Sequence, residues 1–317
     1  MTYYLQAAAV FRQAQQGERV VGSILNDVAV LHVARAEYTK ALELLQEALE
    51  QFETASNSDS QEDNGAEDAP TTGATPNLLS DTNIDVVQIW RNMGECHMNL
   101  KQWQEAMDCF STALQHQRSA RQLHDATQQH DLSSDFDSSA PDDDHNGSKC
   151  QWELLLQMVS DESIADTLRR LGRAMAAAGH HKRAIKTYQE SCEVFRSAVN
   201  DAKLLADSGM VTQLAVKQDQ LSATLYNVGE VQDAMGAYDA AVQTFTEAMR
   251  LRTASDDQRP PEQRCNQVHC AMCLVGIANV RCKQQQFVEA HTLYNNALIF
   301  CEAQGKMHSY HQPTGII

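Results

Sequence analysis

Apolar residues along this chain recur at the three- and four-residue spacings of amphipathic helices, and one short pattern of them returns five times. Its clearest copy runs from Trp90 to Ala113. There an apolar segment ending in a small residue is followed by a second segment with an alanine four residues before a large apolar residue. Residues three and four apart share one face of a helix, so the pattern predicts pairs of helices. The small residues would let the paired helices approach closely, and the predicted fold class is all-α.

The five copies share the same positions of small and large residues. The small residues of the first helices are Ala29, Gly94, Gly172, Gly229 and Ala278. Those of the second helices are Ala41, Ala106, Ala184, Ala241 and Ala290, each four residues before Leu45, Phe110, Tyr188, Phe245 or Tyr294. Five coincident copies favour a repeat array over unrelated amphipathic helices.

The copy Trp90-x2-Met93-Gly94-x2-His97, followed by Trp103-x2-Ala106-x3-Phe110-x2-Ala113, resembles the signature of the tetratricopeptide-repeat (TPR) family. His97 stands where the family has Tyr. The resemblance implies a right-handed superhelical solenoid of antiparallel helix pairs, with the first helices lining a concave groove that holds a peptide or partner protein. The phrase from Leu25 to Ala29 looks like one in kinesin light chains.

The repeat positions predict the organisation of the whole chain. We expect repeats at 20–53, 86–118, 151–200, 201–252 with lengthened helices, and 263–305, then a flexible tail at 306–317. Residues 1–17 match a second helix alone, because Ala7 lies 34 residues before Ala41, the period of the family. A start in mid-repeat, and no polar capping helix after the fifth copy, predict either a longer array or ends that pack against something.

Charge separates two stretches from the repeats. The net charge is −17, yet residues 54–85 carry seven acids and no Lys or Arg, and residues 119–150 carry seven acids against Arg121 and Lys149. Their composition predicts disordered acidic inserts. An acidic chain argues against nucleic acid as partner. Nine scattered cysteines and the lack of a signal peptide or long apolar run predict reduced thiols, no membrane contact, and a location in the cytoplasm or nucleus.

The candidate binding residues flank the small residue of the first helices, where the resemblance places the groove. Asparagine amides both donate and accept, so they suit a peptide backbone. Arginine forks suit carboxylates or phosphates. The predicted partner-binding groove comprises Asn26, Arg91, Asn92, Arg169, Arg170, Arg173, Tyr226 and Asn227. The partner would be a protein or peptide, with an acidic segment as one option, and a solvated polar face is the alternative interpretation.

One stretch fits a calcium loop. Asp142, Asp144, Asn146, Gly147 and Glu153 stand at the spacing of an EF-hand. Hard oxygens, a sharp turn and a closing carboxylate give that spacing its chemistry. No helix precedes the loop, however, and an acidic linker that ends in a turn is the competing interpretation. The corresponding alternative function is a calcium-responsive regulatory protein.

Other chemistry has less support. Cys270-x2-Cys273, near Cys265, His269 and Cys282, hints at metal, but a single pair on a continuous helix predicts core cysteines instead. The sequence has no P-loop, nucleophile elbow, zincin or dinucleotide motif, so we predict no enzyme and no cofactor. The non-catalytic part of a larger protein is a further alternative.

The acidic tract between Ser119 and Asn146 could itself bind the arginines of the predicted groove. Because it precedes the third repeat, it could fold back onto Arg169, Arg170 and Arg173 and compete with a ligand. A solvated spacer is the alternative.

Overall fold

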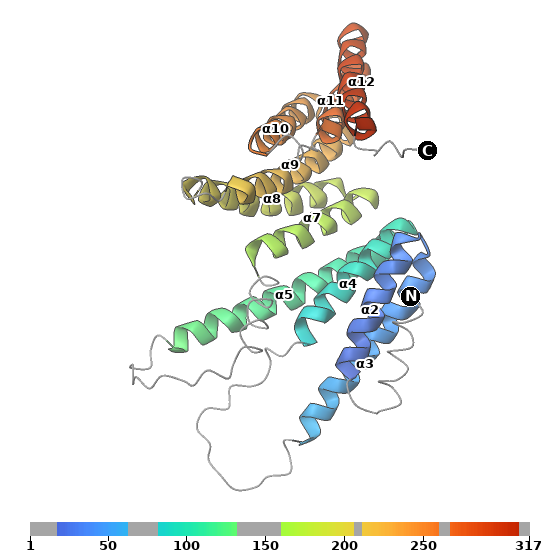
Figure 1. Cartoon of the computed structure of the whole chain (residues 1–317), viewed down its shortest axis with the longest axis vertical. Coiled ribbons are helices and arrows are strands. Elements are labelled where there is room, and N and C mark those ends of the chain that lie inside the picture. The colour runs from blue at the N-terminus through green and yellow to red at the C-terminus, as the bar shows by residue number, and fades with distance from the viewer. Residues whose placement is uncertain (1–17, 63–81, 132–159, 206–210, 260–266, 311–317) are drawn as a thin grey trace, which may run out of the picture. The chain divides into compact units, whose positions relative to one another are not determined.

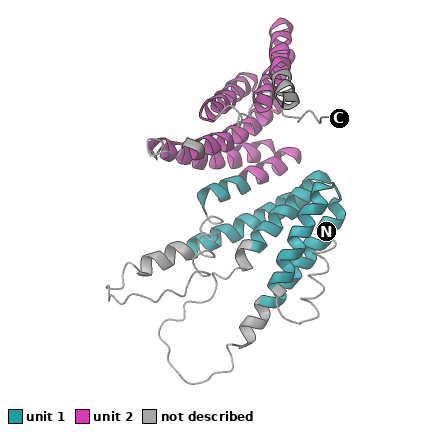
Figure 2. Ribbon diagram, viewed as in Figure 1, with its two compact units in different colours: residues 1–167 teal, residues 168–317 magenta. Residues whose placement is uncertain are grey.

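The computed structural model describes residues 18–62, 82–131, 160–205, 211–259 and 267–310, which contain ten α-helices and no strand (Figure 1). The helices are α2 (Glu18–Ala34), α3 (Tyr38–Glu62), α4 (Thr82–Asn99), α5 (Trp103–Asp131), α7 (Asp161–Ala177), α8 (His181–Leu205), α9 (Val211–Ala234), α10 (Tyr238–Asp257), α11 (Gln267–Lys283) and α12 (Phe287–Tyr310). The all-α fold class is therefore confirmed. The chain divides into two units, residues 1–167 and residues 168–317 (Figure 2).

Small residues bring the two helices of a pair together, as the sequence predicted. Gly94 faces the ring of Phe110, Gly172 that of Tyr188, and Gly229 that of Phe245. A Cβ atom at any of the three glycines would lie 2.6–2.7 Å from the nearest ring carbon, which is too close for a side chain. On the second helices, Ala106 and Ala241 have no exposed surface, which confirms their predicted burial.

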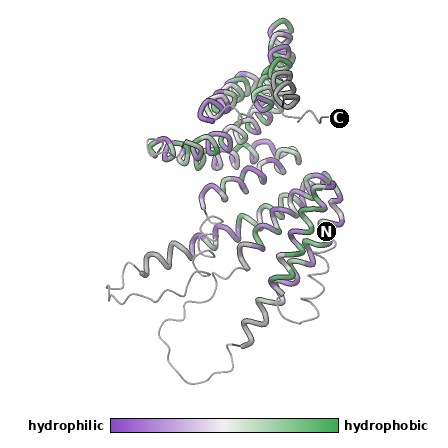
Figure 3. Tube along the Cα trace, in the orientation of Figure 1, coloured by the Kyte–Doolittle hydropathy of each residue, from purple (hydrophilic) through white to green (hydrophobic). Residues whose placement is uncertain are grey.

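Two further glycines do the same work and lie outside the repeat pattern. Gly22 on α2 faces Phe52, and Gly276 on α11 faces Phe245. Phe245 thus packs between glycines of two successive first helices, α9 and α11. Apolar and polar positions alternate along the helices, as Figure 3 shows, and the apolar ones form the core of each unit. None of the helices within the described residues has the length and apolar character needed to cross a bilayer.

The turn inside every described helix pair contains one residue with left-handed backbone angles. These residues are Ala36, Lys101, Gly179, Gly236 and Gln285, with φ between 59° and 83°. Around the first of them, the Ala36 N–H donates to the Val33 carbonyl at 2.9 Å and the Glu37 N–H to the His32 carbonyl at 3.0 Å. Such bonds satisfy the last carbonyls of the helix.

Two helices run further than the composition predicted. α3 continues to Glu62 and α5 to Asp131, so both enter the ranges 54–85 and 119–150 that we expected to be disordered inserts. Residues 54–62 and 119–131 contain neither Gly nor Pro, so nothing in them breaks a helix. A prediction based on acidic composition alone therefore ended both helices too early. The half repeat at 1–17 and the calcium loop at Asp142–Glu153 lie outside the described residues.

Candidate partner-binding site

All eight predicted groove residues lie on first helices, but the structure divides them between the two units. Three belong to the first unit: Asn26 on α2, with Arg91 and Asn92 on α4. The other five belong to the second unit: Arg169, Arg170 and Arg173 on α7, with Tyr226 and Asn227 on α9.

In the first unit the asparagines bind one another. The Asn92 side-chain N–H donates to the Asn26 Oδ1 at 2.8 Å, and the Gln88 amide donates to the Asn92 Oδ1 at 3.0 Å. Asn26 is 8% exposed. Both ends of the Asn92 amide are thus engaged in an internal ladder between α2 and α4. A peptide would have to break one of these bonds to use them.

Arg91 is also engaged within the first unit. Its guanidinium forms a short ion pair with Asp166 at the start of α7, and both side chains are largely buried. This pair links α4 to the first residues of α7, within the first unit. Peptide binding by Asn26, Arg91 and Asn92 stays a prediction, and their contacts give them a structural role.

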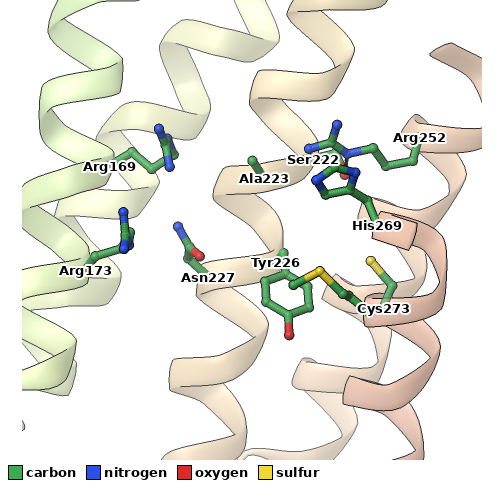
Figure 4. Close-up of a pocket in the computed structure, with 10 residues that line it drawn as sticks. Arg169, Arg173, Ser222, Ala223, Tyr226, Asn227, Arg252, His269 and Cys273 are labelled. Carbon is green, nitrogen blue, oxygen red and sulfur yellow. Dashed lines mark hydrogen bonds between the residues drawn. The ribbon is translucent and has the colours of Figure 1, made fainter. Parts of the chain in front are cut away.

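In the second unit four predicted residues line one pocket. Arg169, Arg173, Tyr226 and Asn227 border a cavity of about 220 Å³, shown in Figure 4. Arg170 is not among the residues that line it. The remaining lining residues, which the sequence analysis did not select, are Ser222, Ala223, Arg252, His269, Met272 and Cys273. The lining contains no carboxylate, so the pocket favours an anionic or neutral polar group.

Arg252 is the most informative addition, because it comes from a second helix, α10. The residue is 7% exposed, and its guanidinium lies 3.2 Å from the Asp219 Oδ1 while its Nε donates to the Ser222 Oγ at 3.2 Å. Ser222 in turn donates to the Ala248 carbonyl at 2.8 Å. The side chain is thus held in one orientation at the pocket. Sequence reasoning missed it because second helices were expected only to pack.

Asp219 is shared by a larger ionic cluster behind the pocket. It accepts from Arg259 at 2.5 Å and from the Ser255 hydroxyl at 2.7 Å. Burial lowers the pKa of Arg252, and Asp219 opposes that effect. An arginine starts so far above neutrality that it remains charged. Burial and the charge of Arg252 lower the pKa of His269, which favours the neutral imidazole at pH 7.

Glu230 is the acidic residue beside the cations of α7. It lies one helical turn after Tyr226, and the two side chains interact. Partial desolvation raises the pKa of Glu230, although the residue is exposed, and the interactions with Tyr226 and Arg173 act against that rise. Glu230 itself does not line the pocket.

Cys270 and Cys273 lie in the core, as the sequence predicted. Both are buried on α11, and burial raises the pKa of Cys273 to about 12. A thiol with so high a pKa is scarcely ionised at neutral pH and is therefore a poor nucleophile. Within the described ranges no three His, Cys, Asp or Glu side chains gather to hold a metal ion. Cys265 and the calcium-loop residues Asp142, Asp144, Asn146 and Glu153 lie outside those ranges.

Comparisons with known proteins agree with this architecture. Profiles described as tetratricopeptide repeat match residues 21–62, 87–120 and 224–259. Among solved structures, BtubC (BKLC) from P. vanneervenii is 13% identical with a TM-score of 0.57, over 99% of this chain and 91% of that one. The apo form of RapI is 12% identical with a TM-score of 0.52, over 95% of this chain and 59% of that one.

A sequence comparison with curated proteins gave no match. At 12–13% identity the two structures support the fold alone. Helix pairs joined by small residues, three matching repeat profiles and two similar folds lead to the same conclusion: this chain contains tetratricopeptide repeats.

Proposed function

We propose that the protein binds a partner protein through an acidic group that enters the pocket of the second unit. Repeats of this family typically serve protein interaction, and that general role is the starting point. One observation carries the finer proposal. Arg169, Arg173 and Arg252, from two different helices, line a single pocket whose lining has no carboxylate.

The contacts of Arg252 explain why such a site would bind firmly. A guanidinium held by Asp219 and Ser222 loses little conformational freedom when a ligand arrives. Arg169 and Arg173 are half-buried and four residues apart, so they present their charges on the same face of α7. Asn227, from α9, adds a neutral donor and acceptor between the two groups of cations (Figure 4).

The test compares the wild-type chain with a variant carrying Arg169→Glu and Arg173→Glu. Both proteins would be used as baits in cross-linking mass spectrometry, and each candidate partner would then be purified and titrated. We expect at least a hundredfold weaker binding by the double variant, because two favourable charges become repulsive.

The matched control carries Lys182→Glu and Lys186→Glu, which make the same change of charge on the exposed face of α8. It should retain wild-type affinity at moderate salt, since neither lysine lines the pocket. Partners that bind all three proteins equally well would refute the proposed site.

A further inference from the structure

The pocket of the second unit presents its donors from several sides. In Figure 4, Arg169 and Arg173 reach in from α7, while Arg252 and His269 approach from the opposite side and Asn227 lies between them. From this arrangement we infer that the pocket binds a phosphate monoester carried on a side chain of the partner. This inference rests on the proposed function and specifies the group that enters.

Shape separates a phosphate from a carboxylate here. A carboxylate is planar and carries one charge, so a single guanidinium fork can satisfy it. The cations of this pocket come from α7 and α10, on opposite sides, and one planar group cannot face all of them at once. A phosphate monoester has three terminal oxygens in a tetrahedral arrangement, and it can accept hydrogen bonds from each direction.

Charge leads to the same ligand. In the cluster behind the pocket, Asp219 and Asp256 balance the guanidiniums of Arg252 and Arg259. Arg169 and Arg173 add two further guanidiniums to the same lining. Three guanidiniums favour the −1.5 to −2 charge of a phosphate monoester at pH 7 over the single charge of a carboxylate.

The nearby weak acids and bases can adjust to such a ligand. The lowered pKa of His269 keeps the free imidazole mostly neutral, and a dianion beside it would favour protonation and add another donor. The cavity of about 220 Å³ has room for one compact group, so the rest of the partner would lie along the first helices outside it.

The experiment uses the full chain and three degenerate peptide mixtures that differ only at one fixed position: phosphoserine, glutamate or serine. Inorganic phosphate and acetate are titrated alongside. We expect the phosphoserine mixture to bind at least tenfold more tightly than the glutamate mixture, and inorganic phosphate to bind more tightly than acetate. Equal affinity for phosphoserine and glutamate mixtures would overturn the inference.

Inorganic phosphate that binds as tightly as the phosphoserine mixture would also overturn it, because the site would then hold a free anion. Arg169→Gln with Arg173→Gln should weaken phosphoserine binding at least tenfold, whereas Arg250→Gln, exposed on α10, should not. Phosphoserine binding that survives the pocket variant would place the anion elsewhere. Arg252→Lys, which retains the charge, should weaken binding while circular dichroism confirms that the variant is folded.

The two proposals can fail separately. If Arg169→Glu with Arg173→Glu abolishes binding of a partner but the peptides show no preference for phosphoserine, the proposed function stands and the phosphate inference does not. If the phosphoserine preference is clear but partners are unaffected by the charge reversal, the pocket binds phosphate apart from the groove function.

Discussion

The two units place an asparagine at the same point of the repeat and use it differently. Asn92 and Asn227 each stand two residues before the small glycine of their helix. In the first unit Gln88 and Asn26 engage both ends of the Asn92 amide. In the second unit Asn227 makes no hydrogen bond or ion pair with any described residue and lines a pocket.

Two neighbouring positions account for this difference. The residue four before the asparagine is Gln88 in the first unit and Ala223 in the second, and a methyl group can neither bond to the amide nor fill the space. The second position lies in the preceding repeat, three residues before its small residue. The first unit has Asn26 there, and the second unit has Arg169. The same repeat positions therefore form a neutral hydrogen-bonded ladder in the first unit and a cationic pocket in the second.

The largest expected effect concerns what the units share. Gly94→Ala and Gly229→Ala would each place a Cβ atom within 2.7 Å of a phenylalanine ring carbon. We expect a loss of about 1–3 kcal/mol in the free energy of unfolding, measured with urea, because a packed interface has no room to shift. In an exposed helix the same change would stabilise by up to about 1 kcal/mol.

A double substitution checks the cause. Combining Gly229→Ala with Phe245→Leu should cost less than the sum of the two single changes, since the smaller side chain leaves room for the methyl group. A neutral result for Gly229→Ala beside a loss for Gly94→Ala would mean that the units do not share this packing.

The next prediction concerns a substitution that makes the second unit resemble the first. Ala223→Gln should put an amide next to Asn227, as Gln88 stands next to Asn92, and fill part of the pocket. We expect about a tenfold loss of affinity for sulfate or the phosphoserine mixture, equal to about 1.4 kcal/mol. The free energy of unfolding should change by less than about 0.5 kcal/mol, as for other such pairs on helices.

The reverse change, Gln88→Ala, is the matched control. It should cost about 0.2–0.5 kcal/mol of stability and create no anion site, because the first unit has neutral Asn26 where the second has Arg169. Anion binding that appears in Gln88→Ala, or persists undiminished in Ala223→Gln, would show that this position does not distinguish the units.

These contrasts mark what the sequence could and could not predict. Helix pairs were predictable because packing demands small residues at fixed spacings, as at Gly94 and Gly229. The pocket was half predictable: Arg169, Arg173, Tyr226 and Asn227 lie on first helices, where the family resemblance directs attention. Arg252 was not, since only three-dimensional packing of α10 brings its guanidinium to α9. Nor could spacing show that Asn26 and Asn92 would bond to each other.

A smaller effect should follow pH. Burial and Arg252 lower the pKa of His269 in the free protein, and a bound dianion would raise it again. Protons are therefore taken up on binding, so affinity should rise as the pH falls through the range around and below the usual histidine pKa. Sulfate is the probe, because its charge is constant between pH 5 and 8, and we expect about two- to fivefold tighter binding at pH 5.5 than at pH 8.

Other charged groups near the site help to assign that effect. Asp219 and Asp256 act on His269 in the opposite direction to Arg252, and Glu230 titrates near Arg173. His269→Asn should flatten the pH dependence, while His291→Asn, exposed on α12, should leave it intact. If Glu230→Gln flattens it instead, the carboxylate rather than the imidazole takes up the proton.

The smallest effect tests whether the acidic tract before the third repeat competes for the pocket. Residues 132–147 carry five acids and no Lys or Arg. Deleting 132–147 removes this tract and leaves α5 and α7 complete. If it occupies the pocket, phosphoserine binding should tighten about twofold at low salt, and the difference should shrink as salt screens the charges.

A substitution of the five acids by Asn or Gln should reproduce the deletion, because charge is the proposed cause. Equal affinities of all three proteins at every salt concentration would leave the tract as a spacer, and the cations of α7 would then be available without displacement of any part of this tract.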